Sequence, residues 1–221
     1  MKDLAILIPS RSRPQSIISL LEALGDTNTR SDVIVVIDDD DPYKESYLDI
    51  EVTTMIVYRD GKGMARPLNK AASFLAWEYR HFAFLGDDHR PRTFEWDRLF
   101  IEELDAIETG IVYGNDLFMK EALPTAVAMT GDIVRALDGM VPKGMIHLYL
   151  DNFWLTLGRD LESISYMPDV IIEHLHPAAG KAEWDDQYKE VNASDIYIQD
   201  LAFLEEYLAS QSYADLLEQL R

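Results

Sequence analysis

The sequence predicts an α/β fold, with a mainly parallel sheet that carries helices on both faces. Short unbroken apolar runs alternate with segments of helical periodicity over the first ~110 residues, which is typical of parallel sheets. The chain has 221 residues, of which 48% are hydrophobic, and this suits one domain with a sizeable core. No internal repeat, linker or low-complexity segment divides it.

The first half supplies four strands and three helices. Each strand is a short apolar run of the kind that is buried on both faces of a sheet. Pro14 stands where a first helical turn would begin, and Gly25 ends the same helix. The strands are expected at residues 4–8, 33–37, 52–58 and 81–85, and the helices at 14–25, 67–79 and 95–107.

The second half is less regular. Strands are expected at 110–113, 125–129 and 169–173, helices at 131–137 and 150–161, and a loop at 180–192. Two short amphipathic helices follow from about residue 196, and we expect them to pack on the body of the protein or on a partner. We therefore predict one domain over residues 1–195 and a C-terminal helical extension over 196–221.

The charge and the cysteine content exclude several classes. The formal net charge is −20, which opposes avid binding to nucleic acid. However, the first 100 residues hold 13 Lys and Arg against 17 Asp and Glu, so a local basic cleft is compatible with them. The chain has no cysteine, no apolar run of the ~20 residues that a membrane span needs, and no secretory signal. We expect a cytoplasmic protein.

Acidic residues follow two of the predicted strands. Residues 38–41 are four aspartates after the second strand, and Asp87 and Asp88 follow the fourth. Ligands of parallel sheets bind beyond the carboxyl ends of the strands. Adjacent carboxylates repel each other, and Mg²⁺ or Mn²⁺, which prefer oxygen ligands, relieve that repulsion. The alternative for Asp87 and Asp88 is an acidic turn or a helix cap.

Other candidate site residues lie near strand ends or helix starts. His174 and His176 alternate in an extended segment and so share one face, where one of them is expected to be functional rather than structural. Asp151 is either an N-cap or a general base. A diphosphate requires basic donors, and about half of the following are expected to be solvated cations instead. The basic candidates are Arg11, Arg13, Lys62, Arg66, Lys70 and Lys181, with Arg11 and Lys62 the strongest.

Taken together, these segments resemble the GT-A fold glycosyltransferases, especially the family-2-like enzymes, and among them the compact bacteriophage-encoded ones. The segments that match are 4–13, 33–40, 82–89, 131–161 and 170–176, and the resemblance covers roughly residues 4–190. It implies a Rossmann-like GT-A fold with a nucleotide-sugar-binding half at 1–110 and an acceptor and catalytic half at 111–195. An origin in a phage would place the protein in the host cytoplasm.

The resemblance also implies site residues and chemistry. Asp151 would be the catalytic base, Asp88 and His176 would bind Mn²⁺ or Mg²⁺, and His174 is the less expected ligand. The donor would be a nucleotide-sugar, a UDP-hexose in the first instance, and one sugar would be transferred with inversion. The residues implied to bind the donor are Pro9, Ser10, Arg11, Arg13, Asp38, Asp39, Asp40, Lys62, Arg66, Asn69, Asp87 and Lys181.

The sequence departs from the family pattern at two points. Gly86 takes the first position of the usual Asp-x-Asp motif, and Leu150 replaces the acidic neighbour of Asp151. The Gln-x-x-Arg-Trp motif of processive enzymes is absent, which favours a single transfer. Two alternatives stay open: a sugar-nucleotide pyrophosphorylase, although residues 9–14 lack its glycine-rich loop, and a non-catalytic nucleotide-sugar-binding protein.

The acceptor and the oligomeric state are left open. Phage-type relatives suggest a hydroxymethylated base in DNA, for which Arg90, Arg92 and Arg98 would form a local phosphate track. A small metabolite, a lipid-linked acceptor and a protein side chain are equally compatible with the sequence.

Overall fold

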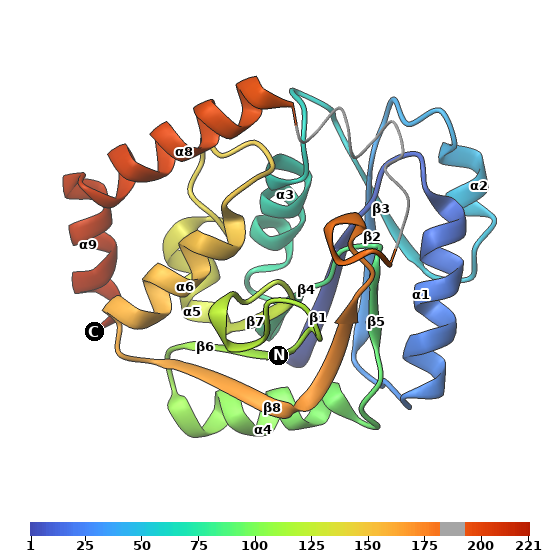
Figure 1. Cartoon of the computed structure of the whole chain (residues 1–221), viewed down its shortest axis with the longest axis horizontal. Helices are drawn as coiled ribbons and strands as arrows, with labels where there is room; N and C mark the ends of the chain where they lie inside the picture. The colour runs from blue at the N-terminus through green and yellow to red at the C-terminus, as the bar shows by residue number, and fades with distance from the viewer. Residues whose placement is uncertain (182–192) are drawn as a thin grey trace.

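A computed structural model describes residues 1–181 and 193–221, and within them a curled sheet of eight strands forms the centre (Figure 1). The strand order is β3-β2-β1-β4-β7-β6-β8-β5. Four strand pairs are parallel, namely β1 with β2 and β4, β2 with β3, and β6 with β8; the pairs that involve β7 or β5 are antiparallel. The strands are β1 (Lys2–Pro9), β2 (Asp32–Asp38), β3 (Thr53–Val57), β4 (Tyr79–Phe84), β5 (His89–Pro91), β6 (Ile111–Asn115), β7 (Val127–Thr130) and β8 (Ile164–His174).

Two apolar layers cover the sheet, because successive side chains of each strand point to opposite faces. On β1, Leu4, Ile6 and Ile8 face one layer, while Ala5 and Leu7 face the other. The first layer receives α1 (Pro14–Asp26), α2 (Lys44–Leu48) and α4 (Trp96–Ile107). The second receives α3 (Ala65–Leu75), α5 (Gly131–Leu137), α6 (Leu150–Asp160), α8 (Ser194–Leu208) and α9 (Gln211–Leu220). The predicted α/β fold with helices on both faces is therefore confirmed.

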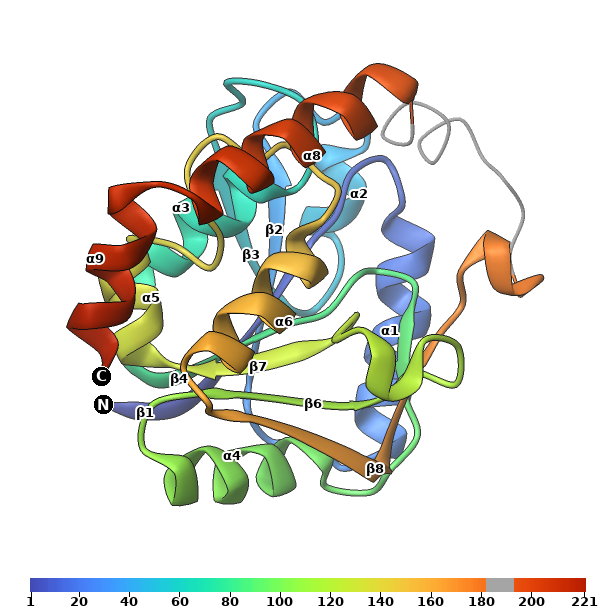
Figure 2. The same ribbon diagram turned by 60° about the vertical axis from the view of Figure 1, so that its left-hand side comes forward.

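The C-terminal helices α8 and α9 belong to the main body. Leu204 of α8 and Tyr213, Leu216 and Leu220 of α9 are buried in the second layer with residues of α5 and α6. Figure 2 shows α8 lying across this side of the molecule, with α9 folded back beside α5. Of the two arrangements expected for these helices, packing on the body is the one in the structure. The domain boundary between residues 195 and 196 stays a prediction.

The second half differs most from the sequence-based expectation. Strand β8 begins at Ile164, five residues before the predicted start, and its pairing with β6 shifts between Gly114 and Asn115. Pro168 lies in this irregularity, where a residue without an N–H group is tolerated. The short elements α2 and β5 were not predicted. Most of the expected loop at 180–192 lies outside the described residues. Among those described, no helix combines the length and apolar character that a membrane span requires.

Candidate active site

The carboxyl ends of β1, β2, β4 and β8 and the start of α6 surround one cavity of about 220 Å³. Strand β7 runs antiparallel to both of its neighbours, β4 and β6. Because of this, β6 and β8 run parallel to β4, and their carboxyl ends lie on the same side of the sheet. Ten of the predicted residues line the cavity: Pro9, Ser10, Arg11, Arg13, Asp38, Asp87, Asp88, Asp151, His174 and His176. The ends of these strands thus bring residues from both halves of the chain together.

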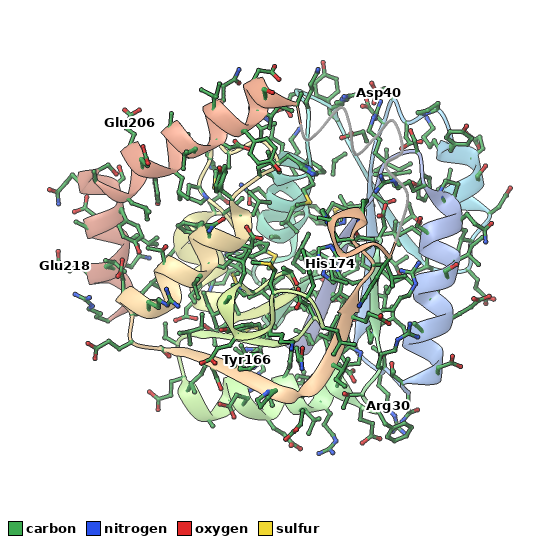
Figure 3. All side chains as sticks on the ribbon, in the orientation of Figure 1. Arg30, Asp40, Tyr166, His174, Glu206 and Glu218 are labelled. Atoms are coloured by element: carbon green, nitrogen blue, oxygen red, sulfur yellow. The ribbon has the colours of Figure 1, made fainter. Side chains whose placement is uncertain are left out.

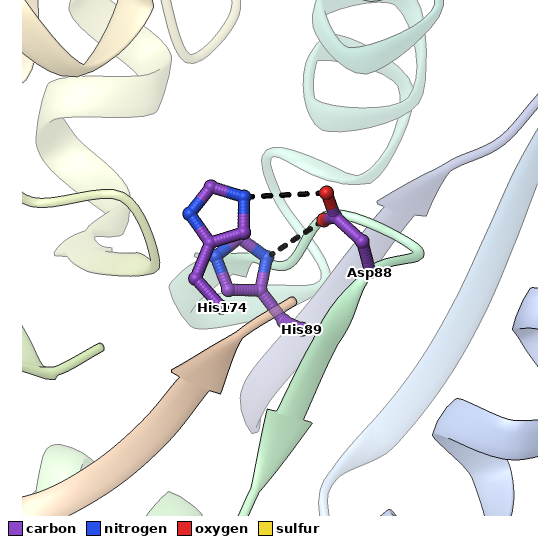
Figure 4. A group of neighbouring side chains, drawn as sticks. All are labelled: Asp88, His89 and His174. Atoms are coloured by element: carbon purple, nitrogen blue, oxygen red, sulfur yellow. Dashed lines mark hydrogen bonds and ion pairs between the residues drawn. The ribbon is translucent and has the colours of Figure 1, made fainter. Parts of the chain in front are cut away.

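Asp88 and His174 form the central pair of this cavity (Figure 4). Nε2 of His174 lies 3.2 Å from Oδ2 of Asp88. Backbone bonds fix this approach: the N–H of Leu175 donates to the carbonyl of Asp88 at 3.0 Å, and that of His174 to the carbonyl of Asp116 at 3.0 Å. A carboxylate and an imidazole at this distance are a suitable ligand pair for a divalent cation.

His89 lies next to this pair, and ligand atoms of Asp88, His89 and His174 lie within 4.8 Å of one another. The ring of His89 stacks on that of His174, with centroids 4.4 Å apart. Its Nδ1 accepts the N–H of Gly86 at 2.7 Å, and burial lowers the pKa of His89 to about 3. His89 is therefore neutral and its accepting nitrogen is occupied, so Asp88 and His174 are the groups positioned to hold a cation.

Because residue 86 is a glycine without a side chain, the carboxylate of Asp88 has room to lie next to it. A Cβ at residue 86 would lie 2.6 Å from Oδ1 of Asp88 and 3.0 Å from Nδ1 of His89. A side chain at the first position of the Asp-x-Asp pattern would displace the carboxylate from its place beside His174. The departure from the family pattern is thus consistent with the arrangement of the pair.

His174 lies between two carboxylates. Burial alone would lower its pKa, but the hydrogen bond to Asp88 and the charges of Asp88 and Asp116 outweigh burial and raise it. Asp116 is 2% exposed, and its Oδ2 lies 4.0 Å from Nδ1 of His174. Its carboxylate also accepts the N–H groups of Phe118 and Lys120 and the hydroxyl of Thr125, so it orders the segment after β6. A bound cation would replace the proton of this imidazole.

Asp87 anchors the loop that carries Asp88. Ser10 donates its hydroxyl to Oδ2 of Asp87 at 2.7 Å, so Tyr47 is the donor in the 2.9 Å bond between the two hydroxyl groups of Tyr47 and Ser10. Arg13 lies 3.5 Å from Oδ1 of the same carboxylate. Burial and the neighbouring Asp88 raise the pKa of Asp87 to about 6. Asp87 therefore links β1 to the end of β4.

A second group of charges lies at the ends of β1, β2 and β3. Arg11 contacts Asp38 at 3.1 Å and Asp40 at 2.7 Å, and Arg59 contacts Asp40 at 3.2 Å. Burial raises the pKa of Asp38 against the opposing effect of both arginines. Arg11, Asp38 and Arg59 line the cavity, so this end offers both guanidinium donors and a carboxylate acceptor to a polar ligand.

Asp151 occupies the first turn of α6 and lines the same cavity. Its Oδ1 accepts the N–H of Asn152 at 2.9 Å, and burial raises the pKa of the carboxyl group. The residue before the helix, Tyr149, has a left-handed backbone with φ of 61°. A half-buried carboxylate with a raised pKa is suited to accept a proton from a ligand hydroxyl.

Six predicted donor-binding residues do not line the cavity. Asn69 is used to bind the segment after α5, since its side chain accepts the N–H groups of Met140 and Val141 and donates to the carbonyl of Val141. Lys181 pairs with Glu173 at 2.9 Å, and Arg66 bonds to the carbonyl of Asp60. Asp39 and Asp40 are exposed and contact Arg59, and Lys62 is exposed in the loop before α3.

Several residues that line the cavity were not predicted, notably Arg59, His89 and His147. Arg59 follows a predicted strand, which is the signal that could have found it. Among the described residues, buried ring nitrogens of His89, His147 and His174 have no hydrogen-bond partner. Buried polar atoms are normally satisfied, so these three nitrogens are free to bond to water or to a bound ligand.

No protein-family model and no curated protein matches the sequence. Solved structures do match. S. aureus TarS 1-349 is 15% identical, with 96% of this chain and 73% of that chain covered and a TM-score of 0.60. The mannosyltransferase PcManGT from Pyrobaculum calidifontis, in complex with GDP-Man and Mn²⁺, is 12% identical, with 98% and 68% covered and a TM-score of 0.62. These likenesses establish the fold of the chain as that of the GT-A glycosyltransferases.

A third similar structure is glucosyl-3-phosphoglycerate synthase from Mycobacterium tuberculosis in complex with Mg²⁺ and UDP. It is 12% identical, with 93% of this chain and 79% of that chain covered and a TM-score of 0.60. The expectation of a Rossmann-like GT-A fold is confirmed by these comparisons.

Proposed function

We propose that the protein is a metal-dependent glycosyltransferase, which transfers one sugar from a nucleoside diphosphate sugar to an acceptor hydroxyl with inversion. The observation that carries this proposal is the meeting of Asp88, His174 and Asp151 in one cavity beside Arg11, Arg13 and Arg59. The site thus combines a pair of cation ligands, a carboxylate with a raised pKa and three guanidinium groups. The similar structures with bound Mn²⁺ or Mg²⁺ and nucleotide support the same assignment.

The metal-ligating side chains of the site fit a divalent cation. Asp88 and His174 would hold it, and Asp116, whose Oδ2 lies 4.0 Å from Nδ1 of His174, would orient the ring. The carboxylate of Asp88 suits Mn²⁺ and Mg²⁺ alike, and Mn²⁺ is the first ion to test because the similar mannosyltransferase structure holds it. When bound, the cation would offset negative charge on the leaving diphosphate.

The other catalytic and binding roles would be carried out by side chains of the protein. Asp151 accepts the proton of the acceptor hydroxyl, whose oxygen forms a bond to the anomeric carbon while the bond from that carbon to the diphosphate oxygen breaks. The electron pair of that bond stays on the diphosphate, where Arg11, Arg13 and Arg59 stabilise the growing charge. Asp38, which is 6% exposed at the end of β2, would accept hydrogen bonds from the nucleoside.

The acceptor stays a prediction, and the structure gives little support to duplex DNA. The arginines of the expected phosphate track are engaged elsewhere: Arg92 pairs with Glu173, Arg98 with Glu95 and Glu102, and Arg90 donates to the carbonyls of Asp87 and His89. Since these arginines are engaged, a small hydroxylated acceptor is the simpler hypothesis. UDP stays the first donor nucleotide to test.

Calorimetric titration with UDP and with GDP, each with and without Mn²⁺, tests this function. We expect one nucleotide to bind only in the presence of Mn²⁺, and Asp88→Ala to abolish that binding. Asp138→Ala, which removes an exposed carboxylate paired with Lys143, is the control and should bind like the unmodified protein. Absence of binding for both nucleotides under every metal condition would favour a non-catalytic protein that keeps only the fold.

A further inference from the structure

Asp200 is a buried carboxylate on α8, and its side chain reaches the segment that precedes α6. It is 0% exposed. Its Oδ1 accepts the N–H of Ile146 at 2.7 Å, and its Oδ2 accepts those of His147 at 2.9 Å and Leu148 at 2.7 Å. A buried carboxylate is costly unless hydrogen bonds compensate its charge, and three consecutive backbone groups provide that compensation here.

The segment that Asp200 holds is part of the candidate site. His147, Leu148 and Tyr149 line the cavity, and Asp151 follows them in the first turn of α6. The carbonyl of Ile146 accepts the N–H of Ala65 at 3.0 Å, which connects the segment to the start of α3. Through residues 146–148, Asp200 is therefore connected to two adjoining parts of the cavity wall. One is the segment that leads into α6, and the other is the start of α3.

Residues 146–148 lie outside the strands and helices, so no sheet ladder or helix holds their N–H groups in place. From this geometry we propose that Asp200 is a positioning residue of the site, which fixes residues 146–148 in the conformation that binds the donor. This inference rests on the proposed glycosyltransferase function. It assigns α8 a role in substrate binding, in addition to its role in the apolar layer.

Asp200→Asn is the sharpest variant, because it keeps the size of the side chain but replaces one accepting oxygen with a donating NH₂ group. At least one of the three N–H groups then loses its acceptor. The matched control is Asp97→Asn. Asp97 is 3% exposed and accepts the N–H groups of Arg30 and Ser31 and the hydroxyl of Ser31. Arg30 and Ser31 precede the amino end of β2, whereas the cavity lies beyond the carboxyl ends of the strands, and Figure 3 shows Arg30 well apart from His174.

The test measures thermal midpoints, hydrogen exchange of the amides of residues 146–148, and binding of UDP-glucose and GDP-mannose with Mn²⁺. We expect both variants to lose thermal stability. Only Asp200→Asn should speed exchange at residues 146–148 and weaken binding of the nucleotide-sugar by roughly 10- to 100-fold. Equal binding by the two variants, or unchanged exchange at residues 146–148, would overturn the inference.

Failure of the two proposals can be told apart. If the unmodified protein binds neither nucleotide-sugar, the proposed function fails. If the protein binds one of them and Asp200→Asn binds it as well as Asp97→Asn does, only the role of Asp200 fails. Should Asp200→Asn not fold, Asp200→Glu keeps the charge and displaces the carboxylate by one methylene group, and the same comparisons with Asp97→Asn apply.

Discussion

His174 stands 86 residues beyond Asp88 in the chain, yet their side chains approach to 3.2 Å and the backbone next to His174 bonds to the carbonyl of Asp88. Sequence reasoning favoured His176 as the metal ligand, whereas this geometry favours His174. His176 also lines the cavity, but its Nδ1 accepts the N–H of Ala178 at 3.1 Å. The two histidines can therefore be distinguished by experiment.

We expect His174→Ala to weaken Mn²⁺ binding by roughly 10- to 100-fold or more, because it removes an imidazole held beside Asp88. His176→Ala should have a smaller effect. Mn²⁺ affinity can be followed by electron paramagnetic resonance of the free ion, without nucleotide or turnover. A larger loss in His176→Ala than in His174→Ala would restore the sequence-based assignment.

Gly86→Ala should weaken Mn²⁺ binding, because the new methyl group would lie 2.6 Å from Oδ1 of Asp88 and force the carboxylate aside. Gly25→Ala is the matched control, since a Cβ at residue 25 of α1 meets no atom within 4 Å. In the helix this control should be neutral or stabilising by up to about 1 kcal/mol. Mn²⁺ titrations of both variants check the prediction, and equal affinities would show that the space at residue 86 is not needed.

Asp151→Asn should reduce kcat by roughly 10²- to 10⁴-fold and leave nucleotide binding unchanged, if Asp151 is the base. Burial raises the pKa of Asp151 above its ordinary value of 3.8, so the active carboxylate form is lost as the pH falls through that raised value. The rate of the unmodified protein should therefore fall on the acid side, and the variant should lack this dependence. A pH profile of kcat measures both effects.

The thermal stability of the same variant shows whether a loss of activity comes from catalysis or from unfolding. A carboxyl group with a raised pKa destabilises the folded state at neutral pH, relative to a neutral group of the same shape. Asp151→Asn should consequently have a thermal midpoint equal to or above that of the unmodified protein. Near-normal turnover in this variant would remove Asp151 as the base.

Arg59→Ala should weaken nucleotide binding by about 10- to 100-fold, the size expected for a hydrogen bond to a charged group. Arg98→Ala removes the same charge from an exposed position on α4, where ion pairs contribute little. We expect this control to bind nucleotide normally. Calorimetry with the nucleotide that the protein binds compares the two, and equal losses would mean that only the overall charge matters.

Much of the fold could be predicted from the sequence because the parallel strands are buried on both faces and so appear as continuous apolar runs. The clustering of Asp38, Asp88 and His174 followed from their positions after strands. The continuation of β8 through the register shift at Pro168 could not be predicted, since a proline indicates a strand boundary. Asn69 looked like a ligand-binding residue, but only the tertiary structure shows that its amide binds residues 140 and 141.

Asp200 illustrates a different limit. Nothing local marks it, because its partners lie 52 to 54 residues earlier and are backbone groups that any sequence has. Contacts of this kind are visible only when the helices are assembled. Asp116 differs, because its bonds to Phe118, Lys120 and Thr125 are local, and only its approach to His174 depends on the tertiary structure.

The long span of the contact between Asp200 and residues 146–148 has a consequence for biosynthesis. A chain emerging from the ribosome can form the strands around Asp38 and Asp88 early, since domains begin to fold during translation. The amides of residues 146–148 must wait until residue 200 has been added, 54 residues after Ile146. The candidate site would therefore be completed in the same step in which α8 packs its buried residues against the second apolar layer.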